Sequence, residues 1–275
     1  MDNLSQNLLK QVKSNKKYSS ISDEIVLSEI KNYLNKNKIA KVTKQDIKEI
    51  RSRLHKSYAS FQTKKKNKIQ DYLDELKQNP NNKDITTKLL SITLSTKERL
   101  KDYKEIYKKI FEITGKPKII LDLGAGFNVF SFPLMTLSML EYYSYDINEK
   151  DIDYLNEYFQ IMKPLGLYGK AAIMDLRNLS KISYLSSLPS SDITFIFKVI
   201  DIIDKQNHKP SEELITTLFK NKRTKFIIAS FATKTITRKS MNFPNRKWFE
   251  LMLTRLNLRF HIIKTDNEIF YVIKN

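Results

Sequence analysis

The chain has 275 residues, with 49 Lys and Arg against 30 Asp and Glu, so its formal net charge is +19. It contains no cysteine, which excludes a disulfide scaffold, thiolate metal ligands, an iron–sulfur cluster and a cysteine nucleophile, and fits a cytoplasmic protein. Hydrophobic residues make up 41% of the chain, enough for a packed core, and its three scattered histidines argue against a metal site.

The sequence indicates neither a signal peptide nor a membrane span. Met1 to Tyr18 carry four lysines but no apolar segment of the kind found in signal peptides. One uncharged stretch, Leu123 to Leu140, has the length of a membrane span. Its glycines, serines and proline are more typical of a strand–turn–helix junction in a packed core. We therefore expect a cytoplasmic monomer that binds neither a membrane nor a metal ion.

The first 115 residues have a helical pattern. Apolar residues recur at helical spacing from Ile25 to Tyr33, from Ile47 to Tyr58 and from Ile69 to Leu76. Thr43, followed by Asp46, resembles the start of the second of these helices. Ser95-Thr96-Lys97-Glu98 has the pattern of a capping box that starts a further helix, continuing through Ile110.

The pattern changes after Gly115-Lys116-Pro117 to short apolar strands alternating with helices such as Glu149–Met162 and Ser211–Lys220. The expected strands are Lys118–Leu123, Leu140–Tyr145, Leu167–Met174, Ile193–Phe197 and Phe226–Phe231, followed by a terminal antiparallel hairpin of Leu258–Lys264 and Glu268–Ile273. Such alternation predicts a parallel, doubly wound sheet. The expected fold class is therefore α/β, with a basic helical domain over residues 1–115 and a Rossmann-like domain over residues 116–275.

The positive charge is concentrated in the helical part. Residues 1–115 hold 26 basic and 14 acidic side chains, whereas residues 116–275 hold 23 and 16. A basic footprint of this kind favours a nucleic-acid partner, although AT-rich coding sequence can also produce a lysine-rich surface. The candidate RNA-binding residues are Arg51, Arg53, Lys56, Lys64, Lys65, Lys66 and Lys68, with Lys234, Arg238 and Lys239 nearer the C-terminus. We expect the first set to form one outward patch beside an apolar face of Leu54, Tyr58 and Phe61.

A glycine-rich turn follows the first expected strand. The strand ends at Asp122-Leu123 and runs into Gly124-Ala125-Gly126, where the backbone can approach a ligand closely. The third glycine of the dinucleotide fingerprint is replaced by Val129, and no Gly-Lys-Ser/Thr phosphate loop is present. The pattern is similar to motif I of S-adenosylmethionine-dependent methyltransferases. The alternative is a tight turn without a ligand.

Two acidic residues follow the next strands. Asp146 ends the second strand about 20 residues beyond the glycines, where an acid can accept hydrogen bonds from both ribose hydroxyls. Asp146 could instead cap the helix that opens at Asn148. Asp175 ends the third strand and is a weaker candidate for an adenine contact.

The stretch from Asp122 to Pro133, Asp-Leu-Gly-Ala-Gly-Phe-Asn-Val-Phe-Ser-Phe-Pro, resembles motif I of the aminoglycoside-resistance 16S rRNA (guanine-N7) methyltransferases of the Arm/Rmt type. Further similar stretches are Tyr18–Val26, Leu54-His55 with Tyr58, Ser95–Arg99, Tyr145-Asp146-Ile147, Phe197-Lys198, Ser230-Phe231 with Lys234, Trp248-Phe249 and Glu268–Tyr271. The resemblance therefore covers Tyr18 to Ile273. It implies helices that dock on 16S rRNA of the small ribosomal subunit, a domain that binds S-adenosylmethionine, and a decoding-site guanine as target. It also suggests aminoglycoside resistance as the biological role.

The motifs and the resemblance together define the candidate site residues. The cofactor-binding residues are Arg99, Asp122, Gly124, Ala125, Gly126, Asn128, Asp146, Ile147, Asp175 and Leu176, and the pocket candidates are Lys198, Phe231 and Trp248. The resemblance gives Arg99 the cofactor carboxylate, although an arginine there could simply pair with Asp102 or Asp122. Lys198 could bind phosphate, shape the base pocket or only line the sheet edge. The two aromatic rings could stack on the target base, or Trp248 could belong to the core.

The target atom explains why no His or Cys catalyst is expected. Guanine N7 has an available lone pair and no proton to lose, so attack on a methyl sulfonium needs no general base. Catalysis would then depend on positioning the two reactants, with the base unstacked into the pocket.

The chain also departs from the family pattern. Val129 stands where members often have proline, Asp201 and Ile202 lie where they carry Leu-Pro, and residues 233–245 lack the family's glycine-rich run. These differences leave the exact base and the resistance role open. The alternatives are a methyltransferase acting on another RNA or a small metabolite, and a non-catalytic RNA-binding protein with a degenerate methyltransferase fold.

Overall fold

The structure is a computed structural model that describes residues 3–37, 39, 42–57, 64–176, 185, 187–204, 209–235 and 245–275. Within these residues, seven strands form one sheet in the order β3-β2-β1-β4-β5-β7-β6. The strands are β1 (Ile119–Leu123), β2 (Leu140–Asp146), β3 (Leu167–Ile173), β4 (Ser191–Phe197), β5 (Thr224–Ala232), β6 (Arg259–Lys264) and β7 (Glu268–Lys274). The first five are parallel, and the β6–β7 hairpin joins the sheet antiparallel to β5. This confirms the expected doubly wound sheet with its terminal hairpin.

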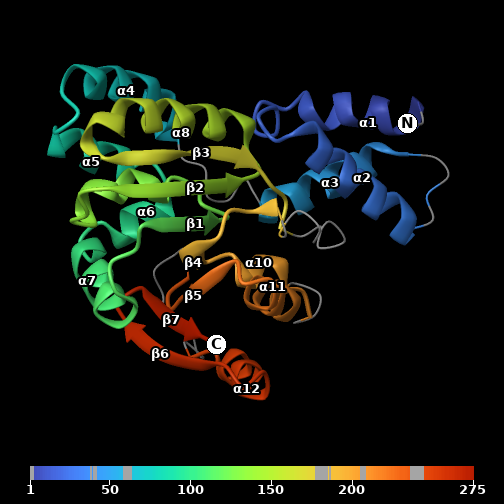
Figure 1. Cartoon of the computed structure of the whole chain (residues 1–275). Helices are drawn as coiled ribbons and strands as arrows, with labels where there is room; N and C mark the ends of the chain where they lie inside the picture. Colours follow the sequence, from blue (N-terminus) through green and yellow to red (C-terminus); the bar gives the residue numbers. More distant parts are fainter. Residues whose placement is uncertain are drawn as a thin grey trace.

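Helices surround this sheet on three sides (Figure 1). In the described chain they are α1 (Asn3–Lys13), α2 (Asp23–Asn37), α3 (Lys44–Ser57), α4 (Ile69–Gln78), α5 (Lys83–Leu90), α6 (Leu94–Arg99), α7 (Tyr103–Thr114), α8 (Glu149–Met162), α10 (Ile200–Ile203), α11 (Lys209–Lys220) and α12 (Lys247–Arg255). Short 3-10 helices include η2 (Lys64–Lys68), η3 (Asn128–Leu134) and η4 (Lys163–Leu165). The described part contains no helix long and apolar enough to cross a lipid bilayer.

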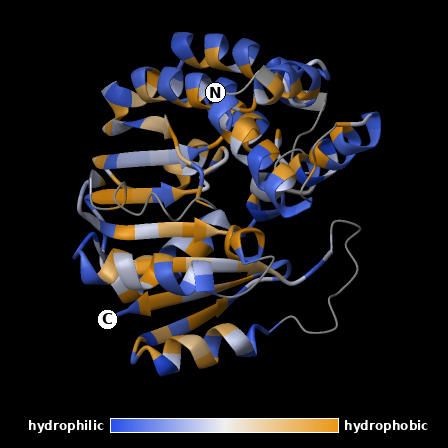
Figure 2. Cartoon of the chain, turned by 90° about the vertical axis from the view of Figure 1, so that its right-hand side faces the viewer, coloured by the Kyte–Doolittle hydropathy of each residue, from blue (hydrophilic) through white to orange (hydrophobic). Residues whose placement is uncertain are grey.

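The two faces of the sheet have separate hydrophobic cores, because successive side chains of a strand point to opposite faces. On one face, residues such as Ile120 and Phe195 pack with α4, α5, α7 and α8. On the other face, Leu121 and Ile196 pack with α11 and α12. Figure 2 shows hydrophobic residues along the strands, with hydrophilic residues on the outer surfaces of the helices.

The helices before β1 divide between two cores. Helices α1–α3 share a small core that includes Leu8, Ile25 and Leu54, and they lie beyond the carboxyl ends of β1–β3 (Figure 1). Helices α4, α5 and α7 instead share the core of the sheet. The switch from helices to strands after Gly115 agrees with the sequence, and the division into domains at residue 115 stays a prediction.

Two helix starts test the capping predicted from the sequence, which is confirmed at α3 and wrong at α6. At α3, Thr43 N donates to Asp46 Oδ2 (2.7 Å) and Asp46 N donates to Thr43 Oγ1 (3.3 Å), as the sequence indicates. The capping box predicted at Ser95–Glu98 is wrong. Helix α6 begins at Leu94 after Thr93, and α7 begins separately at Tyr103. Glu98 accepts a hydrogen bond from Lys198 Nζ (2.7 Å), and its side chain is thus directed away from the helix start.

Candidate functional site

A pocket opens at the carboxyl ends of β1, β2 and β4, where the strand order reverses. Ligands bind at this edge of open parallel sheets because loops from neighbouring strands meet there. The pocket is lined by Lys66, Thr93, Ser95, Gly124, Gly126, Phe127, Asp146, Ile147, Asn148, Asp151, Met174, Asp175, Leu176, Phe197, Lys198, Val199, Ile202 and Ile203. Seven residues predicted from the sequence to bind cofactor or shape the pocket are thereby brought together: Gly124, Gly126, Asp146, Ile147, Asp175, Leu176 and Lys198.

The glycine turn needs both of its glycines. Gly124 has φ +73°, and a Cβ there would lie 2.4 Å from Val199 Cγ2. Gly126 has φ +49°, and no heavy atom lies within 4 Å of where its Cβ would be. Because side chains disfavour positive φ, the turn keeps its shape only with glycine at both positions. The open space at Gly126 leaves room for a ligand to approach the backbone.

Asp146 holds this turn from the end of β2. Its Oδ2 accepts a hydrogen bond from Gly126 N, and its Oδ1 accepts one from Ile147 N, both at 2.7 Å. A carboxylate has about four acceptor positions, so capacity remains for further donors in the pocket. The alternative role as a helix cap is wrong, because Asn148 is the N-cap of α8 and accepts from Asp151 N (3.1 Å). Asp146 is thus free to face a ligand.

A buried network supports the glycine turn from behind. Asn128 donates through Nδ2 to Asp122 Oδ2 (3.0 Å), and its Oδ1 accepts from Tyr103 Oη (2.9 Å). Tyr142 Oη also donates to Asp122. Burial raises the pKa of Asp122 to about 6, although these hydrogen bonds partly oppose the shift. Asp122, Asn128 and Ala125 do not line the pocket, so we infer that the first two act by supporting the turn.

The raised pKa of Asp122 predicts a measurable pH dependence of stability. In the unfolded chain Asp122 loses its proton near pH 3.8, whereas in the folded chain it keeps it to about pH 6. Its stabilising contribution is therefore complete below pH 4 and is lost as the pH rises through 6. Denaturant unfolding of the native protein and of Asp122→Asn, at several pH values, should show this. The stability of the native protein relative to the variant should fall between pH 4 and 6, by about 3 kcal/mol at most. A constant difference would contradict the assignment.

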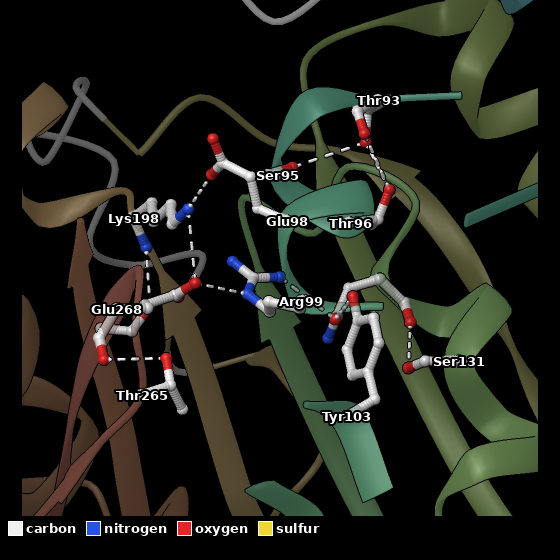
Figure 3. A network of polar contacts seen from close by, with 12 residues as sticks. Thr93, Ser95, Thr96, Glu98, Arg99, Tyr103, Ser131, Lys198, Thr265 and Glu268 are labelled. Carbon is white, nitrogen blue, oxygen red and sulfur yellow. Dashed lines mark hydrogen bonds and ion pairs between the residues drawn. The ribbon is translucent and has the colours of Figure 1, made fainter. Parts of the chain in front are cut away.

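Two cations and two carboxylates form a cluster at one end of the pocket (Figure 3). Arg99 Nε donates to Glu268 Oε2 at 2.8 Å, and both side chains are almost fully buried. Lys198 Nζ contacts Glu98 Oε2 (2.7 Å) and Glu268 Oε2 (3.3 Å). Burial alone would raise the pKa of Glu268, but Arg99 and Lys198 outweigh it and hold that pKa below its usual value. Glu268 therefore stays ionised between the two cations.

This cluster gives Arg99 a partner that the sequence did not indicate. Its guanidinium pairs with Glu268 and lies 4.8 Å from the Phe197 ring centre, and Arg99 does not line the pocket. The observed partner is therefore Glu268 and not Asp102 or Asp122, and the expected role of Arg99 at the cofactor carboxylate stays a prediction. Glu268 lies in the last hairpin, 169 residues away, so sequence spacing could not reveal this partner.

Of the two cations in this cluster, Lys198 is the one that lines the pocket. It follows β4 with φ +59°, a left-handed conformation that is uncommon for any residue other than glycine. Its backbone N–H donates to Ser230 O (3.0 Å), which holds the turn against β5. Such strained positions cluster at functional sites, since the surrounding structure must stabilise them. Lys198 thus lines the pocket and does not merely lie at the sheet edge.

The two aromatic pocket candidates lie elsewhere. Phe231 is completely buried in the core beneath α12, where it packs edge-to-face against Phe249 and Tyr271. Trp248 is half-buried and packs edge-to-face against Phe231 and Phe249. Neither ring lines the pocket. The stacking role expected for Phe231 is wrong in this conformation, and Trp248 packs as the core alternative predicts.

The basic residues expected to form one RNA-binding patch are divided by the structure. Arg51 donates to Gln11 O (2.6 Å) and so ties α3 to the end of α1. Arg53 contacts Glu49 (3.5 Å) and lies 4.8 Å from the Tyr33 ring centre. Lys66 faces the pocket, while Lys68 is exposed and Lys234 is partly exposed. Arg51, Arg53 and Lys66 are therefore engaged within the protein, contrary to the expectation of a free outward patch.

Other parts of that expectation lie outside the described structure. These are Tyr58, Phe61, Arg238 and Lys239, together with the side chains of Lys56, Lys64 and Lys65. Among the described residues, no group of three or more His, Asp or Glu side chains is arranged to hold a metal ion.

Several pocket residues were not assigned to the pocket from the sequence. Asn148 and Asp151 follow Asp146 closely, so their position after β2 was a usable signal. Phe127 lies between the second glycine and Asn128 and could have been found the same way. Lys66 comes from a distant helical segment, and no local pattern distinguishes it from the other lysines of its run.

Comparison with known proteins identifies the family. The sequence profile of the ribosomal RNA methyltransferase (FmrO) family matches residues 14–272, nearly the whole chain. The chain belongs to this family of ribosomal RNA methyltransferases. The match covers α2, α3 and the sheet domain with its pocket, and it begins just after α1.

Individual relatives agree with this assignment. A 16S rRNA (guanine(1405)-N(7))-methyltransferase of Proteus mirabilis is 28% identical over 252 residues, which cover 84% of each chain. Among solved structures, the 16S rRNA methyltransferase RmtF in complex with S-adenosyl-L-homocysteine is similar with a TM-score of 0.79 and 21% identity. That match covers 100% of this chain and 99% of RmtF. The 16S rRNA methylase RmtB gives a TM-score of 0.73 at 20% identity, covering 98% of both chains. The chain thus has the fold of these methyltransferases over its full length.

Proposed function

We propose that this rRNA methyltransferase transfers a methyl group from S-adenosylmethionine to N7 of a guanine in 16S rRNA of the small ribosomal subunit. Four curated relatives are named 16S rRNA (guanine(1405)-N(7))-methyltransferases, which supports the substrate and the target atom. The assignment of S-adenosylmethionine as donor rests on the Gly126–Asp146 contact at the switch point of the sheet. As part of the proposal, the protein acts as a cytoplasmic monomer and can confer aminoglycoside resistance.

The pocket fits the adenosyl half of the donor. Asp146 has unused acceptor positions for ribose hydroxyls, beside the open space at Gly126. Ile147 and Leu176 supply apolar walls for a purine ring, with Asp175 at the end of β3 as an acceptor. When bound, S-adenosylmethionine supplies an electrophilic methyl group on sulfur. The residues of this chain bind and orient that group.

The reaction at guanine N7 needs little acid–base chemistry from the protein. N7 attacks through a lone pair and releases no proton, so the reaction needs no general base from the protein. The ammonium group of Lys198 pairs with the carboxylates of Glu98 and Glu268, which hold its side chain in place at the pocket. Positioning of N7 in line with the methyl group then provides the rate enhancement.

Substrate docking is assigned to helices α1–α3 because their exposed surface is rich in lysine beside the pocket. Lys10, Lys16 and Lys17 are exposed around the end of α1, next to the Arg51 contact. Phosphate contacts of this kind position RNA without reading its sequence. Recognition of the target base then falls to residues around the pocket.

Charge reversal on this surface should separate RNA binding from donor binding. The triple variant Lys10→Glu, Lys16→Glu and Lys17→Glu should weaken 30S binding and lower the salt dependence of binding by about 2–3 in log–log slope. Its affinity for S-adenosylhomocysteine should not change. The matched control reverses Lys104, Lys108 and Lys116, which are exposed in α7 and just beyond it, far from α1–α3. Equal loss of 30S binding in both variants would remove the docking role of α1–α3.

Mapping the modified base tests the function directly. Purified 30S subunits and naked 16S rRNA are incubated with the enzyme and a donor labelled in the methyl group, and the labelled nucleotide is located by mass spectrometry. We expect a single N7-methylated guanine. A label on another atom or in another RNA would overturn the proposed substrate. Binding of RNA and donor without methyl transfer would favour a non-catalytic RNA-binding protein.

A further inference from the structure

The loop after β2 belongs to two structures at once. On one side, Asp146, Ile147 and Asn148 line the pocket. On the other side, Ile147 packs against the core of helices α1–α3, and Asn148 forms an antiparallel bridge with Ile21. The loop is therefore a shared wall between the α1–α3 bundle and the candidate donor site.

Hydrogen bonds fix this wall along its length. Ser22 N donates to Ile147 O (3.3 Å), and Glu149 N donates to Ser20 O (3.1 Å). Asn148 Nδ2 donates to Ser20 Oγ (3.0 Å) while its Oδ1 caps α8. Ile147, Asn148 and Glu149 thus bond to the α1–α3 bundle, while Asp146, the residue just before them, holds the Gly126 turn in the pocket.

A second contact reaches the same rim from η2. Lys66 Nζ donates to both carboxylate oxygens of Asp151, at 2.7 and 2.5 Å. The ammonium also lies 5.2 Å from the Phe127 ring centre, and all three residues line the pocket. Asp151 is in the first turn of α8, three residues after Asn148. Lys66 therefore holds the rim at Asp151, and Ser20 holds it three residues earlier, at Asn148.

We propose that Ser20 and Lys66 are positioning residues for the methyl donor: they hold the rim from Asp146 to Asp151 in the shape that binds the adenosyl group. The inference rests on the proposed function, since it takes Asp146 to be the ribose ligand. Ser20 acts through Asn148, and Lys66 acts through Asp151 and Phe127. The segments before β1 would then form part of the donor site besides docking RNA.

Calorimetric titration of the full-length protein with S-adenosylhomocysteine tests this role. Ser20→Ala, which removes one neutral hydrogen bond, should weaken binding about three- to tenfold. Lys66→Met, which removes the charged donor but keeps most of the length of the side chain, should weaken it about ten- to a hundredfold. Lys66→Arg should restore most of the affinity because it can pair with Asp151.

Matched controls come from neighbouring residues. Ser19→Ala removes a hydroxyl that bonds only to Lys16 O in the described contacts, and Lys68→Met removes an exposed lysine from the same short helix. Both controls should bind like the native protein. A second ligand, 5′-methylthioadenosine, lacks the amino-acid part of the donor. Its affinity should fall by the same factors, since the rim contacts the adenosyl part.

The outcomes separate the two proposals. Native protein that binds no S-adenosylhomocysteine would overturn the donor assignment and this inference with it. Native protein that binds, with Ser20→Ala and Lys66→Met binding within twofold of it, would overturn the positioning role alone. Thermal unfolding of each ligand-free variant shows whether weaker binding comes from a less stable protein. Weaker binding that Lys66→Arg does not restore, in variants that unfold at lower temperature, would show a merely structural role.

Discussion

Replacing Asp146 by alanine should weaken binding of S-adenosylhomocysteine by about 2–4 kcal/mol. The variant loses the proposed ribose acceptors, and it also frees the N–H groups of Gly126 and Ile147 that Asp146 holds at 2.7 Å. The glycine turn would then no longer be fixed beside the ligand. Calorimetric titration measures this loss, which we expect to be the largest effect of any single substitution on donor binding.

Two variants make this measurement specific. Asp146→Asn keeps one acceptor oxygen and should retain part of the affinity. Asp153→Ala removes an exposed carboxylate of α8 and should bind like the native protein. Native-like affinity in Asp146→Ala would refute the ribose assignment and favour a role for Asp146 in the loop alone.

Replacing Glu268 by alanine should destabilise the fold by about 3–5 kcal/mol. The substitution leaves the buried Arg99 guanidinium without its 2.8 Å partner and removes one of the two carboxylates beside Lys198. An uncompensated buried charge is costly because it has lost its hydration as well as its partner. Urea denaturation at pH 7 gives the free energy of unfolding.

The same hairpin offers a control. Asp266 pairs with Lys101 at 2.5 Å, but both side chains are more than half exposed. Exposed pairs contribute little in water, so Asp266→Ala should leave the free energy of unfolding nearly unchanged. Similar losses in the two variants would mean that the Arg99–Glu268 pair contributes no more than an ordinary surface contact.

The sequence determined the features that depend on neighbouring residues. Strand and helix periods predicted the order of elements from β1 to β7, and Thr43 with Asp46 marked the start of α3. The glycine turn and Asp146 could be recognised because a parallel sheet brings the carboxyl ends of its strands to one edge. These predictions needed only local pattern and general topology.

Only the tertiary structure decided which charged residues meet. Arg99 pairs with Glu268 across 169 residues, and Lys66 pairs with Asp151 across 85. Long charged side chains have similar local preferences wherever they occur, so neither pattern nor spacing distinguishes a buried partner from a solvated one. The fold places Arg99 of α6 beside Glu268 of β7 and Lys66 of η2 beside Asp151 of α8, and it removes most of the water around these groups. Charged residues that look interchangeable in the sequence therefore form specific ion pairs, Lys66–Asp151 at the pocket and Arg99–Glu268 in the buried cluster next to it.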